Sequence, residues 1–150
     1  MILNLFLVFL IPWTICLMHL YKKDKVLLFL VAPFFSVVAY LMNALGFYFD
    51  FWEVLPFPEQ KSFASLPFDI GIYPVLSCYC IYSIKKTNKP FLVLLLMTLL
   101  TTFLEGIFVF FDRVIYQNGW NIYFTFFSYL LPYLFLYGYY RFLLKIRVLQ

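Results

Sequence analysis

A single carboxylate interrupts one of the longest apolar stretches of the chain. Residues 90–112, PFLVLLLMTLLTTFLEGIFVFFD, are long enough to cross a bilayer as a helix, which takes about 20 apolar residues at ~1.5 Å each. Glu105 would then lie about 22 Å from Pro90 in a hydrocarbon core roughly 30 Å thick. Because an ionised carboxylate facing lipid costs several kcal/mol, this side chain must turn toward other helices, stay protonated or meet water in a cavity.

Three threonines that precede Glu105 predict the direction in which it points. Thr98, Thr101 and Thr102 lie seven, four and three residues before it, a spacing that stacks the side chains on one face of a helix. Small hydroxylated side chains are typical of the faces through which membrane helices pack together. We therefore expect this face to point into a bundle of helices.

The composition indicates that the whole chain, residues 1–150, is a single membrane domain. Hydrophobic residues make up 65% of the chain and charged residues 12%, against about 25% charged in soluble proteins. The net charge of +4 comes from basic residues beside apolar segments, which favours membrane topology and anionic lipid over nucleic acid as the explanation. Cys16, Cys78 and Cys80 lie inside apolar segments and form no CxxC pair, so they predict buried apolar side chains. With His19 as the single histidine, neither a metal site nor a cofactor is expected.

Hydropathy predicts an all-α polytopic transmembrane bundle of five spans. The first segment lacks a preceding basic region and a following A-x-A-like cleavage site, so we expect a retained helix rather than a signal peptide. The third segment is the shortest. The five predicted spans are residues 2–21, 26–49, 68–84, 91–111 and 120–144.

The basic residues predict the orientation of these spans, because cytoplasmic loops collect Lys and Arg. Clusters follow the first span (22–25), the third span (85–89) and the end of the fifth span (141–147), and together hold nine of the eleven basic residues. Five crossings with the amino terminus outside and the carboxyl terminus inside place all three clusters on the cytoplasmic side. We therefore expect a multi-pass protein of a cytoplasmic membrane.

Residues 50–67, DFWEVLPFPEQKSFASLP, are predicted to form an outer loop that lies in the headgroup layer. Its three prolines disfavour a regular helix, and its aromatic residues suit the interface. Trp52 in this loop and Trp120 at the start of the fifth span are the expected interfacial anchors. The short connection that ends in Asn118-Gly119 predicts that the fourth and fifth spans are antiparallel neighbours.

Polar residues of three spans are expected at one level of the bundle, near its outer end. Asn43 ends the second span, Asp69 begins the third and Glu105 lies in the outer third of the fourth. Two readings of such a cluster stay open: an outward-facing polar pocket, or a hydrogen-bonded knot that holds the helices in register. The candidate cluster comprises Glu105, Asp69, Asn43, Tyr73, Thr101 and Thr102.

Several short motifs resemble those of a family of small, mostly five-span membrane proteins from spore-forming Gram-positive bacteria. They are the segments 66–69 (LPFD), 73–76 (YPVL) and 89–90 (KP), the intramembrane Glu105 and the segment 120–129. The resemblance covers most of the chain after Asn43 and implies a fold and a bacterial cytoplasmic membrane, but no activity. Where members of that family carry a polar residue in the third helix and a Glu in the fourth, Asp69 and Glu105 are the matching positions.

Three classes of function follow from these observations. The first is a non-enzymatic membrane component that interacts with lipid, with a membrane protein partner or with a second copy of itself. The second is a carrier subunit for protons, cations or a small molecule that uses Glu105 and Asp69. The third is an intramembrane enzyme with the same carboxylates as acid and base; the lack of protease or soluble catalytic motifs favours a non-enzymatic protein over it.

Overall fold

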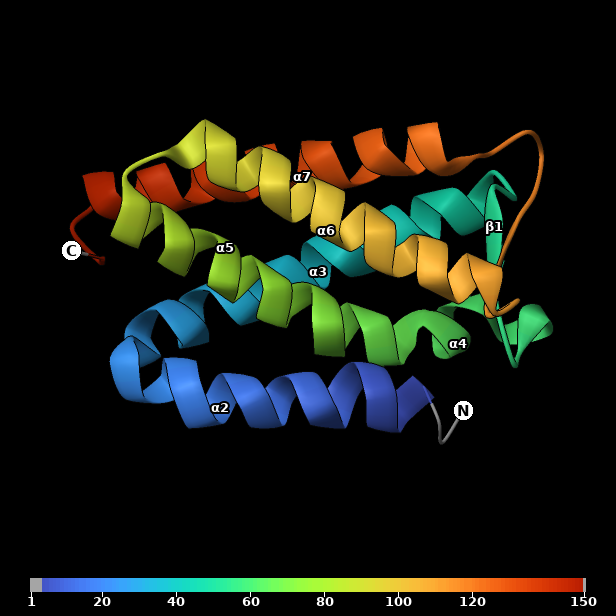
Figure 1. Ribbon diagram of the computed structural model, residues 1–150, viewed down its shortest axis with the longest axis horizontal. Helices are drawn as coiled ribbons and strands as arrows, with labels where there is room; N and C mark the ends of the chain where they lie inside the picture. The colour runs from blue at the N-terminus through green and yellow to red at the C-terminus, as the bar shows by residue number, and fades with distance from the viewer. Residues whose placement is uncertain (1–3, 150) are drawn as a thin grey trace.

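The computed structural model describes residues 4–149, which form five long helical segments lying side by side (Figure 1). Residues 2 and 3, where the first span was predicted to start, lie outside the described part. Two of the five segments contain π-helical turns, and the third begins with a 3-10 turn. The segments are Leu5–Leu10 with α2 (Ile11–Lys23), α3 (Lys25–Tyr48), Pro58–Gln60 with α4 (Lys61–Pro67), Phe68–Ile72 and α5 (Tyr73–Thr87), α6 (Pro90–Phe110), and α7 (Ile122–Lys145).

Four of these segments in the described chain are long and apolar enough to cross a membrane: Leu5–Lys23, Lys25–Tyr48, Pro58–Thr87 and Pro90–Phe110. Helix α7 is 24 residues long, but six tyrosines lower its hydropathy below that of the other four. The prediction of a helical bundle with membrane-length apolar helices is therefore confirmed. Helices α6 and α7 pack against each other along most of their length and run in opposite directions, as their short connection predicts (Figure 1).

The third helical segment begins about ten residues earlier than the sequence indicates, so the prediction of an irregular loop over residues 50–67 is wrong for its second half. Pro58 occupies the first turn of the 3-10 helix, where its missing N–H is not needed. Pro67 ends α4 and is followed by the wider π-helical turn. Prolines at these positions are compatible with a helix, and the segment Pro58–Thr87 is nearly continuous.

Pro74 lies inside this long segment, and another helix compensates for it. Proline lacks the N–H that would bond the carbonyl four residues earlier, here that of Ile70. The indole of Trp13 on α2 donates to the Ile70 oxygen at 2.7 Å. A side chain of a neighbouring helix thus satisfies the backbone group that proline frees, as membrane helices require.

A short antiparallel sheet at one end of the bundle was not predicted. Strand β1 (Trp52–Val54) pairs with β2 (Val114–Tyr116), with Trp52 opposite Tyr116 and Val54 opposite Val114. The sheet joins the connection after α3 to the connection between α6 and α7. The sheet lies at the end of the bundle opposite the α2–α3 connection (Figure 1).

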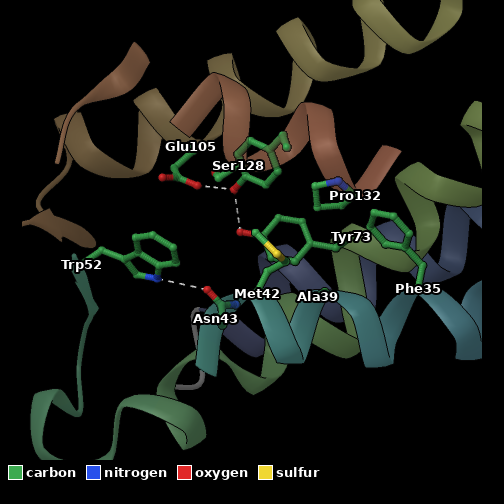
Figure 2. A pocket seen from close by; sticks show the side chains of 10 residues that line it. Phe35, Ala39, Met42, Asn43, Trp52, Tyr73, Glu105, Ser128 and Pro132 are labelled. Atoms are coloured by element: carbon green, nitrogen blue, oxygen red, sulfur yellow. Dashed lines mark hydrogen bonds between the residues drawn. The ribbon is translucent and has the colours of Figure 1, made fainter. Parts of the chain in front are cut away.

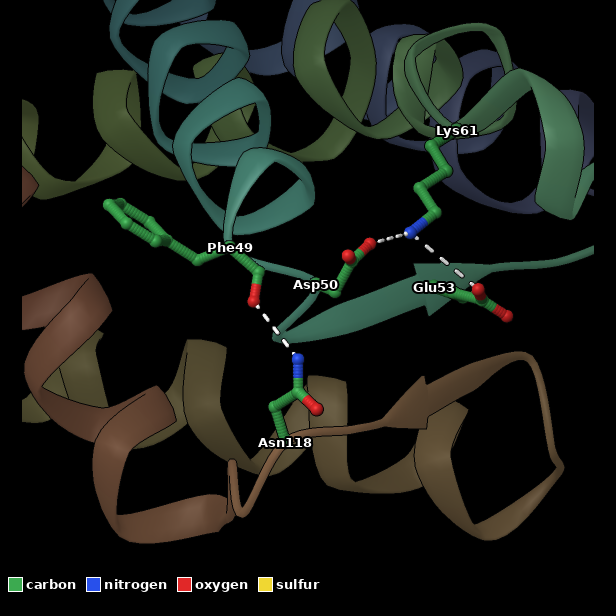
Figure 3. A network of polar contacts seen from close by, with 5 residues as sticks. All are labelled: Phe49, Asp50, Glu53, Lys61 and Asn118. Carbon is green, nitrogen blue, oxygen red and sulfur yellow. Dashed lines mark hydrogen bonds and ion pairs between the residues drawn. The ribbon is translucent and has the colours of Figure 1, made fainter.

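Charged residues gather at the two ends of the bundle. The α2–α3 connection, the α5–α6 connection and the end of α7 lie together, and we call this the basic end; the sheet lies at the other end (Figure 1). At the basic end Lys85 Nζ lies 2.7 Å from Asp24 Oδ2. At the sheet end Lys61 Nζ lies 2.5 Å from Asp50 Oδ1 and 3.6 Å from Glu53 Oε1 (Figure 3).

The helices pack through an apolar core and present large apolar side chains outward. Cys16, Cys78 and Cys80 are buried with free thiols, which confirms the prediction of buried apolar side chains. In contrast, Phe103 is 67% exposed and Phe110 80% exposed on the outer face of α6. Such a surface suits lipid rather than water.

Candidate functional site

Glu105 on α6 turns toward α7 and the sheet, where three hydroxyl groups surround its carboxylate. Tyr116 on β2 donates to Oε1 at 2.8 Å, and Thr125 on α7 lies 3.4 Å from the same oxygen. Tyr129, one turn after Thr125, donates to Oε2. Both carboxylate oxygens therefore accept hydrogen bonds from groups outside α6.

Further side chains extend this network on both sides of the carboxylate. Tyr73 on α5 and Tyr129 share a hydrogen bond of 2.9 Å between their hydroxyl oxygens. The indole of Trp120 donates to Thr125 Oγ1 at 2.9 Å, and Thr125 in turn lies 2.9 Å from Tyr116 Oη. One continuous network thus connects α5, α6, α7 and β2.

Tyr116 lies outside the helices and remains a proton donor over the ordinary pH range. Burial of the phenol, followed by the nearby charge of Glu105, raises the pKa of Tyr116 above its usual value. Because ionisation would place a second negative charge beside the carboxylate, the neutral phenol is favoured. The Tyr116 hydroxyl therefore keeps its proton and donates a hydrogen bond to Glu105.

Asp69 forms a second network at the same end of the bundle. Its side chain is fully buried, and Oδ1 accepts from the Asn43 amide at 2.6 Å while Oδ2 lies 3.0 Å from Ser65 Oγ. The Asn43 carbonyl oxygen accepts from the indole of Trp52 at 3.1 Å. This network connects α3, α4 and β1.

Two small cavities separate the networks, and both are lined by Glu105, Asn43, Trp52 and Tyr73. The larger has a volume of about 40 Å³ and lies between α3 and α7, with Phe35, Met42 and Pro132 among its apolar walls (Figure 2). The smaller has about 20 Å³ and reaches Ser65 beside Asp69. Since one water needs roughly 10–15 Å³ of cavity volume, the cavities have room for a few waters.

Four of the six residues predicted as a cluster meet here: Glu105, Asp69, Asn43 and Tyr73. The two threonines do not join their hydrogen bonds. Thr101 lies 2.8 Å from Tyr133 Oη and 2.8 Å from the Met97 carbonyl. The Thr102 hydroxyl is buried and has no partner among the described residues, and its side chain lines an apolar groove on the outer face of α6.

The indole N–H groups of the two predicted interfacial anchors point into the bundle. Trp52 donates to Asn43 and Trp120 donates to Thr125, and both side chains are only partly exposed. Their rings also pack together, with centroids 4.9 Å apart. The role of Trp52 and Trp120 as interfacial anchors stays a prediction; in addition, each indole closes one of the polar networks.

Sequence reasoning missed four members of the networks: Ser65, Tyr116, Thr125 and Tyr129. Ser65 precedes Asp69 by four residues, a helical spacing that the predicted loop over residues 50–67 concealed. Thr125 and Tyr129 have the same spacing on α7 and could have been found from it. Tyr116 offers no such signal, because only the pairing of β2 with β1 brings it to Glu105.

No basic side chain pairs with either carboxylate within residues 4–149, where the three ion pairs involve Asp24, Asp50 and Glu53. The same part of the chain holds no group of three His, Cys, Asp or Glu side chains that could ligate a metal ion. What remains is two acidic groups held by neutral donors next to small cavities. Such groups stabilise helix contacts, and they can also take up a proton or attract a cation.

Comparison of the chain with protein-family models, with curated proteins and with solved structures found no match. The function must therefore be argued from the geometry of the networks, the cavities and the charged ends.

Proposed function

We propose that the chain is a five-span integral protein of a bacterial cytoplasmic membrane, with its amino terminus outside and its carboxyl terminus inside, and that it acts as a non-enzymatic component that binds lipid or a membrane protein partner. The resemblance noted from the sequence supports the bacterial setting. The proposal makes α7 a fifth span alongside the four apolar segments Leu5–Lys23, Lys25–Tyr48, Pro58–Thr87 and Pro90–Phe110.

Support for α7 as a span comes from its length and from the direction of its side chains. Its 24 residues extend about 36 Å, more than the ~30 Å of a hydrocarbon core. Tyr133 and Tyr140 are buried against neighbouring helices, whereas Phe127, Leu131 and Phe135 are exposed. The polar side chains that lower the hydropathy of α7 are thus partly hidden from lipid.

Support for the orientation comes from the gathering of three basic clusters at one end of the bundle (Figure 1). Single cysteines introduced at Lys22 and Lys86 test it, with Glu59 and Asn118 as matched positions at the sheet end. In intact cells, a membrane-impermeant maleimide should label positions 59 and 118 and leave positions 22 and 86 unlabelled until the cells are permeabilised. Labelling of position 22 or 86 in intact cells would contradict the proposed orientation.

The observation that carries the non-enzymatic proposal is that every oxygen of both carboxylates accepts a hydrogen bond from another element. Glu105 accepts from β2 and α7, and Asp69 accepts from α3 and α4. A general acid or base must instead reach a substrate, and the adjoining cavities hold only a few waters. The networks are accordingly proposed to hold the helices in the arrangement that a lipid or partner recognises.

Replacement of Glu105 by Gln tests this proposal, because Gln keeps the size but loses acceptor capacity. We expect lower abundance and a lower melting temperature in detergent, together with loss of a co-purifying lipid or partner. Asp112→Asn serves as a control because it removes the same charge from an exposed side chain. Unchanged abundance and melting temperature of Glu105→Gln, combined with loss of an ion flux in liposomes, would overturn the proposal in favour of a carrier.

A carrier subunit for protons or cations is the second candidate, and one specific observation favours it. Glu105 lines both small cavities, the smaller of which reaches Ser65 beside Asp69, and neither carboxylate has a cationic partner within residues 4–149. Such groups in membrane helices commonly lie on ion pathways. Purified protein in liposomes loaded with a pH-sensitive dye should then dissipate a proton gradient, and Asp69→Asn should slow this flux without unfolding the bundle.

A further inference from the structure

A cleft at the basic end of the bundle has the chemistry of an anion site. It lies between the end of α5, the beginning of α6 and the end of α7, and it is open to the surroundings, with a volume of about 850 Å³. Volumes of roughly 300–1,000 Å³ are typical of ligand sites. We propose that this cleft binds the phosphate headgroup of an anionic phospholipid of the inner leaflet. The inference rests on the proposed membrane orientation, which places this end at the cytoplasmic surface.

Two cations of α7 line the cleft one helical turn apart. Arg141 and Lys145 are both exposed, and neither forms an ion pair among the described residues. Among the described residues, the guanidinium of Arg141 donates a hydrogen bond to Tyr137, with 3.2 Å from Nη1 to the hydroxyl oxygen, and lies 6.0 Å from the centroid of the same ring. The nearby Asp24 is already paired with Lys85 at 2.7 Å. The positive charge of the cleft is therefore available to an external anion.

Neutral hydrogen-bond donors face the same cleft. Asn88 lines it, and Asn88 ends α5 in a left-handed conformation with its side chain exposed. Helix α6 begins at Pro90, another lining residue, and no side chain caps its amino terminus. Pro90 itself has no N–H, but the positive end of the α6 dipole favours an anion beside it. These groups supplement the charges of Arg141 and Lys145.

The remaining lining residues favour a lipid over free phosphate as the ligand of the cleft. Ile84, Phe142 and Leu144 give the cleft an apolar wall beside its charged part. Phe142 is 54% exposed and continues into the apolar outer face of α7. A headgroup held by Arg141 and Lys145 would thus have its acyl chains against apolar side chains, a combination that inorganic phosphate does not use. Basic pockets beside membrane helices on the cytoplasmic side commonly bind such lipids.

The test compares phosphatidylglycerol with phosphatidylcholine, which differs in having a zwitterionic headgroup, as probes of the full chain in a neutral detergent. Native mass spectrometry should show retention of phosphatidylglycerol at least fivefold above phosphatidylcholine. The double replacement Arg141→Gln with Lys145→Gln should remove this preference. The matched control, Lys22→Gln with Lys25→Gln, removes two exposed charges from the same end but outside the cleft, and should keep it.

Three outcomes would overturn the proposal: no preference in the unaltered chain, equal losses in the two double variants, or displacement of the lipid by millimolar inorganic phosphate. Arg141→Lys keeps the charge and should retain most of the preference. It controls for misfolding as a cause of the loss in the double variant. Maleimide labelling distinguishes a failure of the lipid site from a failure of the orientation. If the lipid preference is lost while residues 22 and 86 lie inside, this site alone is refuted. If residues 22 and 86 lie outside, the orientation is refuted.

Discussion

The Asn43 amide nitrogen on α3 donates to Asp69 Oδ1 at 2.6 Å, and its carbonyl oxygen accepts from the indole N–H of Trp52 at 3.1 Å. One side chain thus connects a buried carboxylate to the sheet. The arrangement explains how a fully buried Asp69 is tolerated without a cation: Asn43 and Ser65 each provide one donor. It also explains why α3 and the π-helical turn Phe68–Ile72 keep a defined register.

The first prediction concerns this bond. Asn43→Leu leaves Asp69 Oδ1 and the indole N–H of Trp52 without their partner, and should destabilise the bundle by about 1–2 kcal/mol. Combining it with Asp69→Leu should recover part of the loss, because replacing both partners by apolar groups removes the unsatisfied carboxylate. Thermal unfolding in detergent measures both variants. A double variant less stable than Asn43→Leu would contradict the interpretation.

The second prediction compares two tyrosines bound to Glu105. Tyr129→Phe removes a donor to Glu105 and the partner of Tyr73, whereas Tyr116→Phe removes a donor that has Thr125 as a neighbour. We expect each to lower stability by roughly 0.5–1.7 kcal/mol, with the larger loss for Tyr129→Phe. Tyr139→Phe is the control, since Tyr139 stacks on Phe34 through its ring. Equal melting temperatures of all three variants would argue against the network.

The third prediction concerns a close approach of two helices at Gly71. A Cβ at this position would lie 2.2 Å from the Val8 carbonyl oxygen and 2.9 Å from Phe9 Cα, both backbone atoms. Gly71→Ala should therefore separate the first helix from the third and cost about 1–3 kcal/mol. Gly138→Ala, where an added Cβ would have no atom of another described element within 4 Å, should instead raise stability by up to ~1 kcal/mol through helix propensity. The two melting temperatures should move in opposite directions.

The fourth prediction separates two roles of Asp24. Its Oδ1 accepts the Leu27 N–H at 3.0 Å and caps α3, while Oδ2 pairs with Lys85 at 2.7 Å. Asp24→Asn keeps a capping oxygen and should cost less than 0.5 kcal/mol, with a loss that shrinks in high salt. Asp24→Ala removes both contacts and should cost about 1 kcal/mol more. Chemical denaturation of the two variants at low and high salt measures the difference.

The fifth prediction is a dependence of stability on alkaline pH. Burial and the charge of Glu105 raise the pKa of Tyr116 above the value of about 10 for an exposed tyrosine. The folded state therefore binds the phenolic proton more tightly than the unfolded state. The stabilisation from this proton is fully present below pH ~10 and is lost as pH rises through the folded pKa. Tyr116→Phe should flatten this part of the pH profile, and an unchanged profile would assign the effect to other groups.

Local sequence patterns predicted the helices and the interior face of α6. Thr98, Thr101 and Thr102 are all buried, as their spacing before Glu105 indicates. The predicted span over residues 91–111 differs from α6 by a single residue at each end. Helical periodicity is carried by residues three and four apart, so one sequence is enough to read it.

The exact beginning of the third helix could not be read in the same way. Three prolines between residues 56 and 67 indicated a loop, yet Pro58 and Pro67 lie where a helix tolerates them. The carbonyl of Ile70, freed by Pro74, is satisfied by Trp13 from a different helix. The partner of the carbonyl that Pro74 frees inside this segment therefore lies 57 residues away in the chain.

By itself, the sequence determined that the chain forms a helical bundle with membrane-length apolar helices, two charged ends and a carboxylate that faces other helices, because hydropathy and helical spacing are local properties. The tertiary structure alone decided what that carboxylate touches. Tyr116 reaches Glu105 only through the pairing of β2 with β1, and Tyr129 reaches it only through the packing of α7 on α6. Contacts between residues far apart in the chain are set by the packing of whole elements, and no short pattern encodes them.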